Sequence, residues 1–267
     1  MNRAEQETFQ LTAELAEAYE AWFVPGFFAQ WAPHLLDGAG VAAGQRVLDV
    51  GCGTGIVART AAERVGSTGT VAGVDLNEAM LAVARRVAPE LQWRQGDAGA
   101  LPFDPASFDV VLSQMAMMFF PEPAAALREM RRVVRPGGTV GVLVPGSLAT
   151  NPPYELFVDV VTRNAGEEAR RLVTSYFALG DLDGLTGLLT DAGLDVTATG
   201  SPVGEFRYDS IDQLVGVELD STPLGGRLEP GVREAILADC QNALAGYLTS
   251  TGEVLFPFES RLVIATK

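Results

Sequence analysis

The sequence has few cysteines and a shortage of basic residues, and each shortage excludes a class of protein. Its 267 residues include two cysteines, Cys52 and Cys240, which form neither a metal-binding spacing nor a disulfide framework. Two free thiols in a reducing cytoplasm are the simplest interpretation. Lysine and arginine number 19 against 34 acidic residues, giving a net charge of −15. Proteins that follow nucleic-acid phosphates need clustered basic side chains, so no nucleic-acid partner is expected.

Long apolar runs are also absent. No uninterrupted run reaches the ~18 residues of a membrane-spanning helix, so no membrane partner is expected. The first residues, MNRAEQETFQLTAELAEAYEAWF, carry acids and lack the apolar centre of a signal peptide. We therefore expect a cytoplasmic protein. Hydrophobic residues make up 48% of the chain, enough for one large domain or a domain with a lid.

The most informative motif present is RVLDVGCGTG, from Arg46 to Gly55, followed at once by the helical pattern IVARTAAERV. Glycine tolerates positive φ and has no Cβ, so a ligand can approach the backbone of such a turn. The helix start adds free N–H groups. A dinucleotide fingerprint, G-x-G-x-x-G, would need a third glycine where the chain has Ile56. A nicotinamide-dependent oxidoreductase is therefore the less favoured alternative.

Strand and helix patterns alternate along the first half of the chain. Strands are expected at TVAGVDL, LQWRQGDA, FDVVLSQ and TVGVLVP, separated by helical segments, which is typical of a parallel sheet. Beyond Pro145 we expect helices over 155–163, 167–178 and LDGLTGLLTDAGL. A sixth strand should follow at LDVTATG, then a mostly helical segment over 208–252 and a final strand at LFPFESRLVIAT.

Five motifs occur in one order: DVGCGTG, VDL, GDAGALPF, FDVVLSQ and REMRRVVRPGG. Together they resemble class I S-adenosylmethionine (SAM)-dependent methyltransferases, and among them the small-molecule, ubiquinone/menaquinone-type and natural-product group. The resemblance is good over about the first 145 residues and holds only in outline beyond them. It implies an α/β, Rossmann-like, doubly wound, seven-stranded, mostly parallel sheet with helical lid insertions.

The resemblance also implies SAM as cofactor, a small-molecule acceptor, and a monomer or homodimer. One domain is expected over residues 1–267, with an N-terminal helical lid (1–40) and a SAM-binding half (41–145). A substrate half (146–267) should carry a second helical lid at about 208–252. The predicted reaction is methyl transfer to an oxygen, nitrogen or carbon atom of a small organic acceptor. The alternative is a SAM-binding protein that catalyses a non-methylating reaction or serves as a binding module.

Candidate cofactor contacts follow the strand ends. Asp75 lies 20 residues after Gly55, where a carboxylate can accept hydrogen bonds from ribose hydroxyls; the alternative is a strand-end cap. The resemblance places Asp97 against the adenine, although an Asp there can also cap a loop. Asp49 is expected to lie beneath the glycine turn, where it orders the N–H groups of that turn and can also face the amino group of SAM through water. The predicted cofactor-binding residues are Tyr19, Trp22, Phe28, Asp49, Gly51, Cys52, Gly53, Gly55, Asp75, Leu76, Asp97, Ala98, Gln114 and Met115.

The aromatic members of this set, Tyr19, Trp22 and Phe28, have two interpretations. They can cover the sulfonium of SAM, since aromatic rings attract cations, or they can pack a helix on the sheet. Gln114 and Met115, at the end of the fourth strand, should lie beside the methionine part of SAM. No metal ligand is predicted.

No catalytic residue is assigned. The only histidine, His34, is either a general base or a helix-surface residue, and the second interpretation is favoured. Methyl transfer can also proceed by in-line placement of the two reactants without an acid or base. The tetrapeptide NPPY, Asn151–Tyr154, occurs after the fourth strand in amino-methyltransferases. Here the fifth strand intervenes, so a helix start with proline in the first turn is favoured over a substrate contact.

Overall fold

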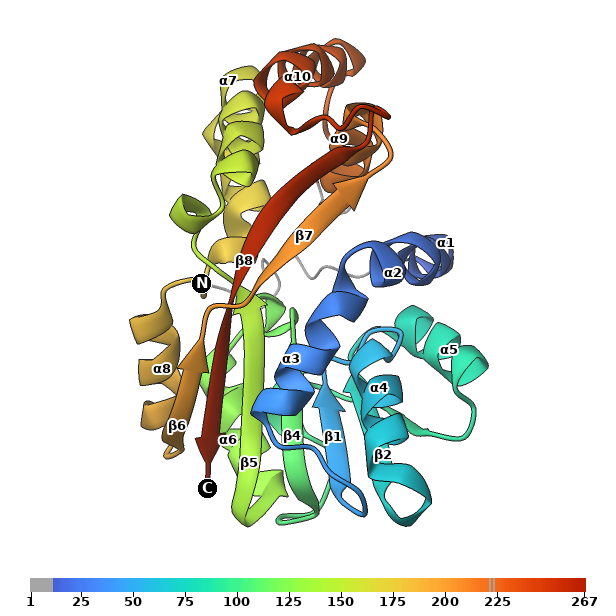
Figure 1. Ribbon diagram of the computed structural model, residues 1–267, viewed down its shortest axis with the longest axis vertical. Helices are drawn as coiled ribbons and strands as arrows, with labels where there is room; N and C mark the ends of the chain where they lie inside the picture. Colours follow the sequence, from blue (N-terminus) through green and yellow to red (C-terminus); the bar gives the residue numbers. More distant parts are fainter. Residues whose placement is uncertain (1–11, 221, 223) are drawn as a thin grey trace.

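The protein is built on one mostly parallel sheet, seen in a computed structural model that describes residues 12–220, 222 and 224–267 (Figure 1). The strand order is β3-β2-β1-β4-β5-β8-β6, and β7 pairs with β8 beside this path. The strands are β1 (Arg46–Val50), β2 (Thr70–Asp75), β3 (Gln92–Gln95), β4 (Phe108–Gln114), β5 (Val134–Pro145), β6 (Asp195–Gly200), β7 (Val203–Tyr208) and β8 (Val254–Thr266). Strands β1 to β5 pair in parallel, whereas β8 is antiparallel to its neighbours. The predicted fold class is confirmed, with eight strands in place of seven.

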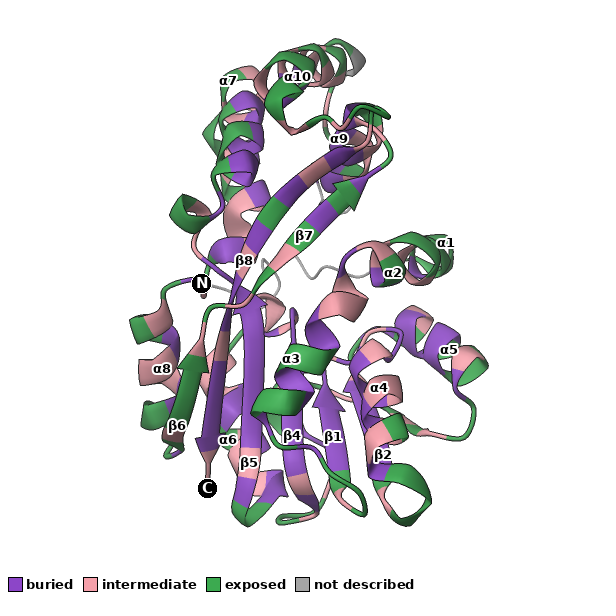
Figure 2. Ribbon diagram, in the orientation of Figure 1, coloured by how far each residue is buried: buried purple, intermediate pink, exposed green. Residues whose placement is uncertain are grey.

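Helices cover both faces of this sheet. Those of the described residues are α1 (Ala13–Ala18), α2 (Val24–Gly26), α3 (Trp31–Gly38), α4 (Ile56–Val65), α5 (Glu78–Val87), α6 (Pro123–Val133), α7 (Pro152–Thr174), α8 (Leu182–Asp191), α9 (Ile211–Asp220) and α10 (Pro230–Ala243). Helices α3 and α4 contribute to one hydrophobic cluster, and α6 and α8 to another. The central strands β1, β4 and β5 are accordingly buried, whereas the edge strand β6 is exposed (Figure 2).

Local sequence explains the helix boundaries around the first strands. The side chain of Asn77 accepts hydrogen bonds from the backbone N–H groups of Ala79 and Met80 and so caps the start of α5. Helix α4 begins directly after Gly55 and ends at Gly66, whose φ of 63° an L-residue rarely adopts. The helix predicted over 155–163 and most of the helix predicted over 167–178 lie in one element, α7, which is interrupted at Gly166 with a φ of 84° and is followed by a 3-10 turn, Ser175–Phe177. No described helix is both long and apolar enough to cross a membrane.

The second half of the chain builds a cap over the sheet, defined here as α7, α9, α10, β7 and residues 254–259 of β8. Strand β8 belongs to both parts: residues 254–259 pair with β7, and residues 260–266 pair with β5 (Figure 1). Helix α10 packs against α7 and α9. Strand β7 was not predicted: residues 203–207 carried no expected element and Tyr208 was expected to begin a helical segment, because the partner of β7 lies about fifty residues later in the chain. Pairing over that separation leaves little local signal.

Candidate functional site

A cavity of about 610 Å³ lies between the carboxyl edge of the sheet and the cap. Its sheet end is lined by residues that follow four neighbouring strands, namely Gly51, Asp75, Asp97 and Met115. Its cap end is lined mainly by aromatic side chains of the cap and of the N-terminal segment 12–40. Ligands of open α/β sheets bind at this edge, outside the carboxyl ends of the strands. The cavity is also within the size range of small-molecule sites.

The glycine turn between β1 and α4 forms part of the sheet end. Gly51, Gly53 and Gly55 have φ values of 71°, 54° and 91°. A Cβ at Gly51 would lie 2.6 Å from the Cβ of Ala116, and one at Gly55 would lie 2.3 Å from the Trp93 ring. At Gly53 the nearest atoms are 3.9 Å away, in the Tyr19 ring. Packing therefore explains Gly51 and Gly55, whereas Gly53 opens toward the cavity, where a side chain would occupy ligand space.

Asp75 connects this turn to the start of α5. Its carboxylate accepts hydrogen bonds from the backbone N–H of Gly53 and of Asn77, each at 2.8 Å. Burial raises the pKa of Asp75, and the hydrogen bonds from Asn77 and Gly53 lower it. Asp75 also lines the cavity. The two interpretations of this residue are thus compatible, because the strand-end cap leaves the carboxyl group on the ligand side.

Asp49 has a different partner from the one predicted. Its carboxylate is 1% exposed and accepts a hydrogen bond from the backbone N–H of Ala58, in the first turn of α4, at 3.1 Å. It therefore orders the helix start, and the prediction that it orders the N–H groups of the glycine turn was wrong. Burial raises the pKa of Asp49 to about 7, with a further upward contribution from Asp75 and a downward one from the Ala58 hydrogen bond.

The structure brings most of the predicted residues to one cavity. Its lining includes Tyr19, Phe28, Gly51, Gly53, Asp75, Leu76, Asp97, Ala98 and Met115. The predicted residues outside the lining are Trp22, Asp49, Cys52, Gly55 and Gln114. Trp22 is 66% exposed. Gln114 is buried beneath the N-terminal segment, where its side-chain Nε2 donates to the backbone carbonyl of Phe28 at 3.0 Å. These two residues therefore do not face the cavity, because Trp22 points outward and Gln114 is used in packing.

The N-terminal segment joins the sheet to the cap. Glu20 and Arg59 form a two-point ion pair, with a shortest distance of 2.7 Å, that fixes the segment to α4. The Tyr19 ring lies 4.9 Å from the Phe28 ring, and Phe27 stacks on Phe206 of β7 at 3.9 Å. Tyr19 begins a π-helical turn, Tyr19–Phe23, a distortion common at functional sites. The segment thus forms a wall shared by both ends of the cavity.

Other candidates for chemistry lie away from the cavity. His34 is exposed on α3, in agreement with the helix-surface interpretation. Cys52 and Cys240 are buried free thiols, and burial raises the pKa of each. Among the described residues, no group of three or more His, Cys, Asp or Glu side chains is arranged to hold a metal.

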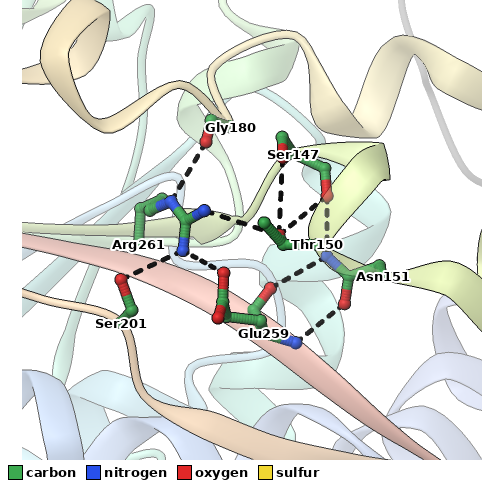
Figure 3. A network of polar contacts seen from close by, with 7 residues as sticks. All are labelled: Ser147, Thr150, Asn151, Gly180, Ser201, Glu259 and Arg261. Carbon is green, nitrogen blue, oxygen red and sulfur yellow. Dashed lines mark hydrogen bonds and ion pairs between the residues drawn. The ribbon is translucent and has the colours of Figure 1, made fainter.

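Two residues of the NPPY tetrapeptide have different places: Asn151 joins two parts of the chain, and Tyr154 lines the cavity. Asn151 donates to the carbonyls of Ser147 (3.0 Å) and Glu259 (3.2 Å), and its Oδ1 accepts from the Glu259 N–H at 2.7 Å (Figure 3). Its amide thus fastens β8 to the start of α7, next to Arg261, which donates to the Gly180 carbonyl at 3.1 Å. Asn151 is absent from the cavity lining, whereas Tyr154 is part of it. The amide therefore joins β8 to the start of α7, outside the cavity lining.

Sequence reasoning missed the polar groups that α9 contributes to the cavity wall, and among them Glu218 is the buried one. The buried residues of this helix are Ile211, Leu214, Val215, Glu218 and Leu219. Their spacing is that of one helix face, so Glu218 lies on the apolar side of an amphipathic helix. A carboxylate on the apolar side of a helix was the signal in the sequence that could have identified Glu218. Its partners gave no signal, because Tyr154 is 64 residues away and Tyr208, ten residues away, belongs to a strand that the sequence did not predict.

Comparison with known proteins agrees with this geometry. Residues 48–142 match the family model described as a methyltransferase domain. The demethylmenaquinone methyltransferase of Staphylococcus epidermidis is 36% identical over 179 residues, covering 62% of this chain and 74% of the relative. A putative methyltransferase from Bacillus halodurans shares the fold with a TM-score of 0.61 at 20% identity, covering 88% of this chain and 98% of its own. The [4+2]-cyclase SpnF shares it with a TM-score of 0.56 at 21% identity, covering 90% and 80% respectively.

The sheet order and the ligand-sized cavity at its carboxyl edge define a Rossmann-like, cofactor-binding enzyme fold. Within that class, the chain belongs to the class I, small-molecule SAM-dependent methyltransferases, and its cofactor is SAM. The nicotinamide alternative is thereby set aside, in keeping with Ile56 at the position of the third glycine.

Proposed function

We propose that this protein transfers the methyl group of SAM to an oxygen, nitrogen or carbon atom of a small, largely apolar organic acceptor. The observation that carries the proposal is the single cavity, which runs from the glycine turn and Asp75 to the aromatic side chains of the cap. Cofactor and acceptor can therefore meet without crossing solvent. The name of the Staphylococcus relative, a demethylmenaquinone methyltransferase, supports an apolar acceptor.

In this proposal the sheet end of the cavity holds SAM. Asp75 accepts hydrogen bonds from the ribose hydroxyls, Leu76 packs on the nucleoside, and Asp97 with Ala98 contacts the adenine. The open side of Gly53 receives the cofactor backbone, and Met115 lies beside the methionine part. Tyr19 and Phe28 face the sulfonium, whose positive charge favours aromatic neighbours. Methyl transfer then depends on proximity and in-line orientation of the acceptor.

The N-terminal segment and the cap would form a lid over these reactants. Both line the cavity, and neither is needed to complete the parallel sheet. Closure would exclude water and align the acceptor. Hydrogen exchange with and without S-adenosylhomocysteine (SAH) tests this assignment. Protection should extend to residues 13–38 as well as to the glycine turn, and protection confined to the glycine turn and Asp75 would make the N-terminal segment a packing element only.

The decisive test of the function has two parts. Calorimetry should show binding of SAM and SAH and none of NAD, because the turn is followed by Asp75 and lacks the third dinucleotide glycine. Incubation with SAM and candidate acceptors should then release SAH together with a product heavier by one methylene unit. Turnover without SAH would instead favour a non-methylating reaction, an alternative supported by the fold shared with the cyclase SpnF.

We further propose a cytoplasmic monomer or homodimer with no nucleic-acid partner. The two buried thiols are typical of a reducing compartment, and the net charge of −15 opposes binding to phosphates. Size-exclusion chromatography with light scattering distinguishes the two oligomeric states.

A further inference from the structure

The cap end of the cavity contains a buried carboxylate in a wall rich in aromatic side chains. Glu218 is 5% exposed and lines the cavity together with Phe27, Tyr154, Phe177, Phe206 and Phe258. These rings pack closely, with centroid distances such as 5.2 Å between Phe206 and Phe258 and 4.8 Å between Tyr154 and Phe177. A wall of this kind suits the flat faces of an aromatic ligand.

Two tyrosines hold the Glu218 carboxylate in a fixed place. Tyr208 of β7 donates its hydroxyl hydrogen bond to Oε1 at 2.5 Å, and Tyr154 of α7 donates to Oε2. The three residues come from three different elements of the cap. A carboxylate has about four lone-pair sites, so it can accept hydrogen bonds in addition to those from the two phenols. The group is therefore oriented in advance, at a place in the wall of the cavity.

A purely structural role explains this arrangement poorly. Burying a carboxylate among aromatic rings is costly, and apolar side chains of similar volume join packed elements at lower cost. Burial raises the pKa of Glu218, while the two tyrosine hydrogen bonds lower it. Asp220, the other carboxylate of α9 in the lining, is half exposed and paired with Arg233 at 2.7 Å.

Resting on the proposed function, we propose that Glu218, oriented by Tyr154 and Tyr208, selects the methyl acceptor by accepting a hydrogen bond from its hydroxyl group. The acceptor class that matches the wall is a flat aromatic molecule with a phenol-type O–H. The hydroxyl anchors the molecule at the cap end, and its ring system extends between the aromatic side chains toward the sheet end. Glu218 thereby acts as the specificity-determining residue of the cavity.

A pair of probes of nearly equal shape tests this assignment. 2-Naphthol and 2-methylnaphthalene differ by a hydroxyl in place of a methyl group, and their binding is measured by competition fluorescence with SAH present at saturation. The wild-type protein should bind 2-naphthol about tenfold more tightly or better, because a hydrogen bond to a charged group is strong when desolvated. Equal binding, or tighter binding of the more apolar 2-methylnaphthalene, would overturn the assignment without any variant.

Variants then test which residue causes the preference for 2-naphthol over 2-methylnaphthalene. Glu218→Gln should remove most of the preference for 2-naphthol, whereas Asp220→Asn, the matched change on the same helix and cavity, should leave it unchanged. Tyr208→Phe removes one support but keeps the carboxylate, so it should lower thermal stability while retaining most of the preference. A structural role would instead make the Glu218 and Tyr208 variants alike in stability and leave the preference unchanged in both. Saturation with SAH is verified first. Failure of SAH binding would contradict the proposed function, whereas a wild-type protein that binds SAH but shows no preference for 2-naphthol would contradict only the role of Glu218.

Discussion

The two ends of the cavity are made in different ways. At the sheet end, the wall includes backbone turns and short polar side chains at the ends of successive strands, such as Gly53, Asp75 and Asp97. At the cap end, the wall consists of large side chains that come from separate elements, such as Tyr154 of α7 and Glu218 of α9. The sheet end depends on local spacing and backbone shape, while the cap end depends on which distant side chains meet. Changes at the sheet end should therefore alter cofactor affinity, and changes at the cap end should alter acceptor choice.

The largest effect on cofactor affinity is expected for Gly53→Val. A branched side chain would occupy the open side of the turn and resist its φ of 54°. The affinity for SAH measured by calorimetry should fall by at least about a hundredfold. Gly66→Val is the matched control, since Gly66 has a φ of 63° and no neighbour within 4 Å of the added Cβ. That control should lower stability and leave SAH affinity unchanged; equal losses in both variants would show that strain alone, without cofactor contact, explains the result.

Asp75→Ala should come next, with a loss of about ten- to a hundredfold in SAH affinity, because hydrogen bonds to the ribose hydroxyls disappear. Thermal stability should also fall, because the N–H groups of Gly53 and Asn77 lose their acceptor. Asp109→Ala provides the comparison. Asp109 pairs with Arg46 and Arg135 at the opposite edge of the sheet, so this variant should lose stability and retain SAH affinity. An unchanged dissociation constant for Asp75→Ala would limit Asp75 to its capping role.

A smaller effect is expected for the N-terminal wall, where the side chain of Tyr19 lines the cavity and that of Trp22 is exposed. Tyr19→Ala should weaken SAM binding several-fold, because the ring lies beside Phe28 in the cavity lining. Trp22→Ala should bind SAM like the wild type, because its side chain is 66% exposed. Titration of both variants with SAM and SAH also tests the charge contribution, since only SAM carries the sulfonium. Loss of affinity in the Trp22 variant alone would reverse the assignment of the two residues.

The smallest effect on affinity, but a measurable one on stability, is expected for Asp49→Asn. Burial raises the pKa of Asp49 to about 7, so the folded state holds a proton that the unfolded state releases near its ordinary pKa of about 4. The contribution of Asp49 to the free energy of unfolding is therefore fully present at low pH. It falls as the pH rises toward 7, by up to about 1.4 kcal/mol per pH unit. Denaturant unfolding at pH 5 and pH 8 should show a smaller decline for Asp49→Asn than for the wild type, and parallel declines would contradict the raised pKa.

Much of the sheet end could be predicted because its signals are local. The strand, glycine turn and helix occupy consecutive residues, so spacing alone placed Gly53 and Asp75 at the same edge. The side-chain partners were harder to foresee: Asp49 bonds to Ala58, and Gln114 bonds to the Phe28 carbonyl. In each case spacing gave the position in the chain, while the partner depended on how a helix or a distant segment packs against it.

By itself the sequence determined the parallel core, the glycine turn, the caps of α5 and the acidic character of the chain, because each follows from neighbouring residues or from composition. Only the tertiary structure decided that β7 pairs with the first half of β8, that Trp93 packs beneath Gly55, and that Tyr154 and Tyr208 meet at Glu218. These contacts join residues from distant parts of the chain. The physical reason is that burial and hydrogen bonding stabilise contacts between side chains from separate elements. Such contacts leave no periodic pattern in the sequence.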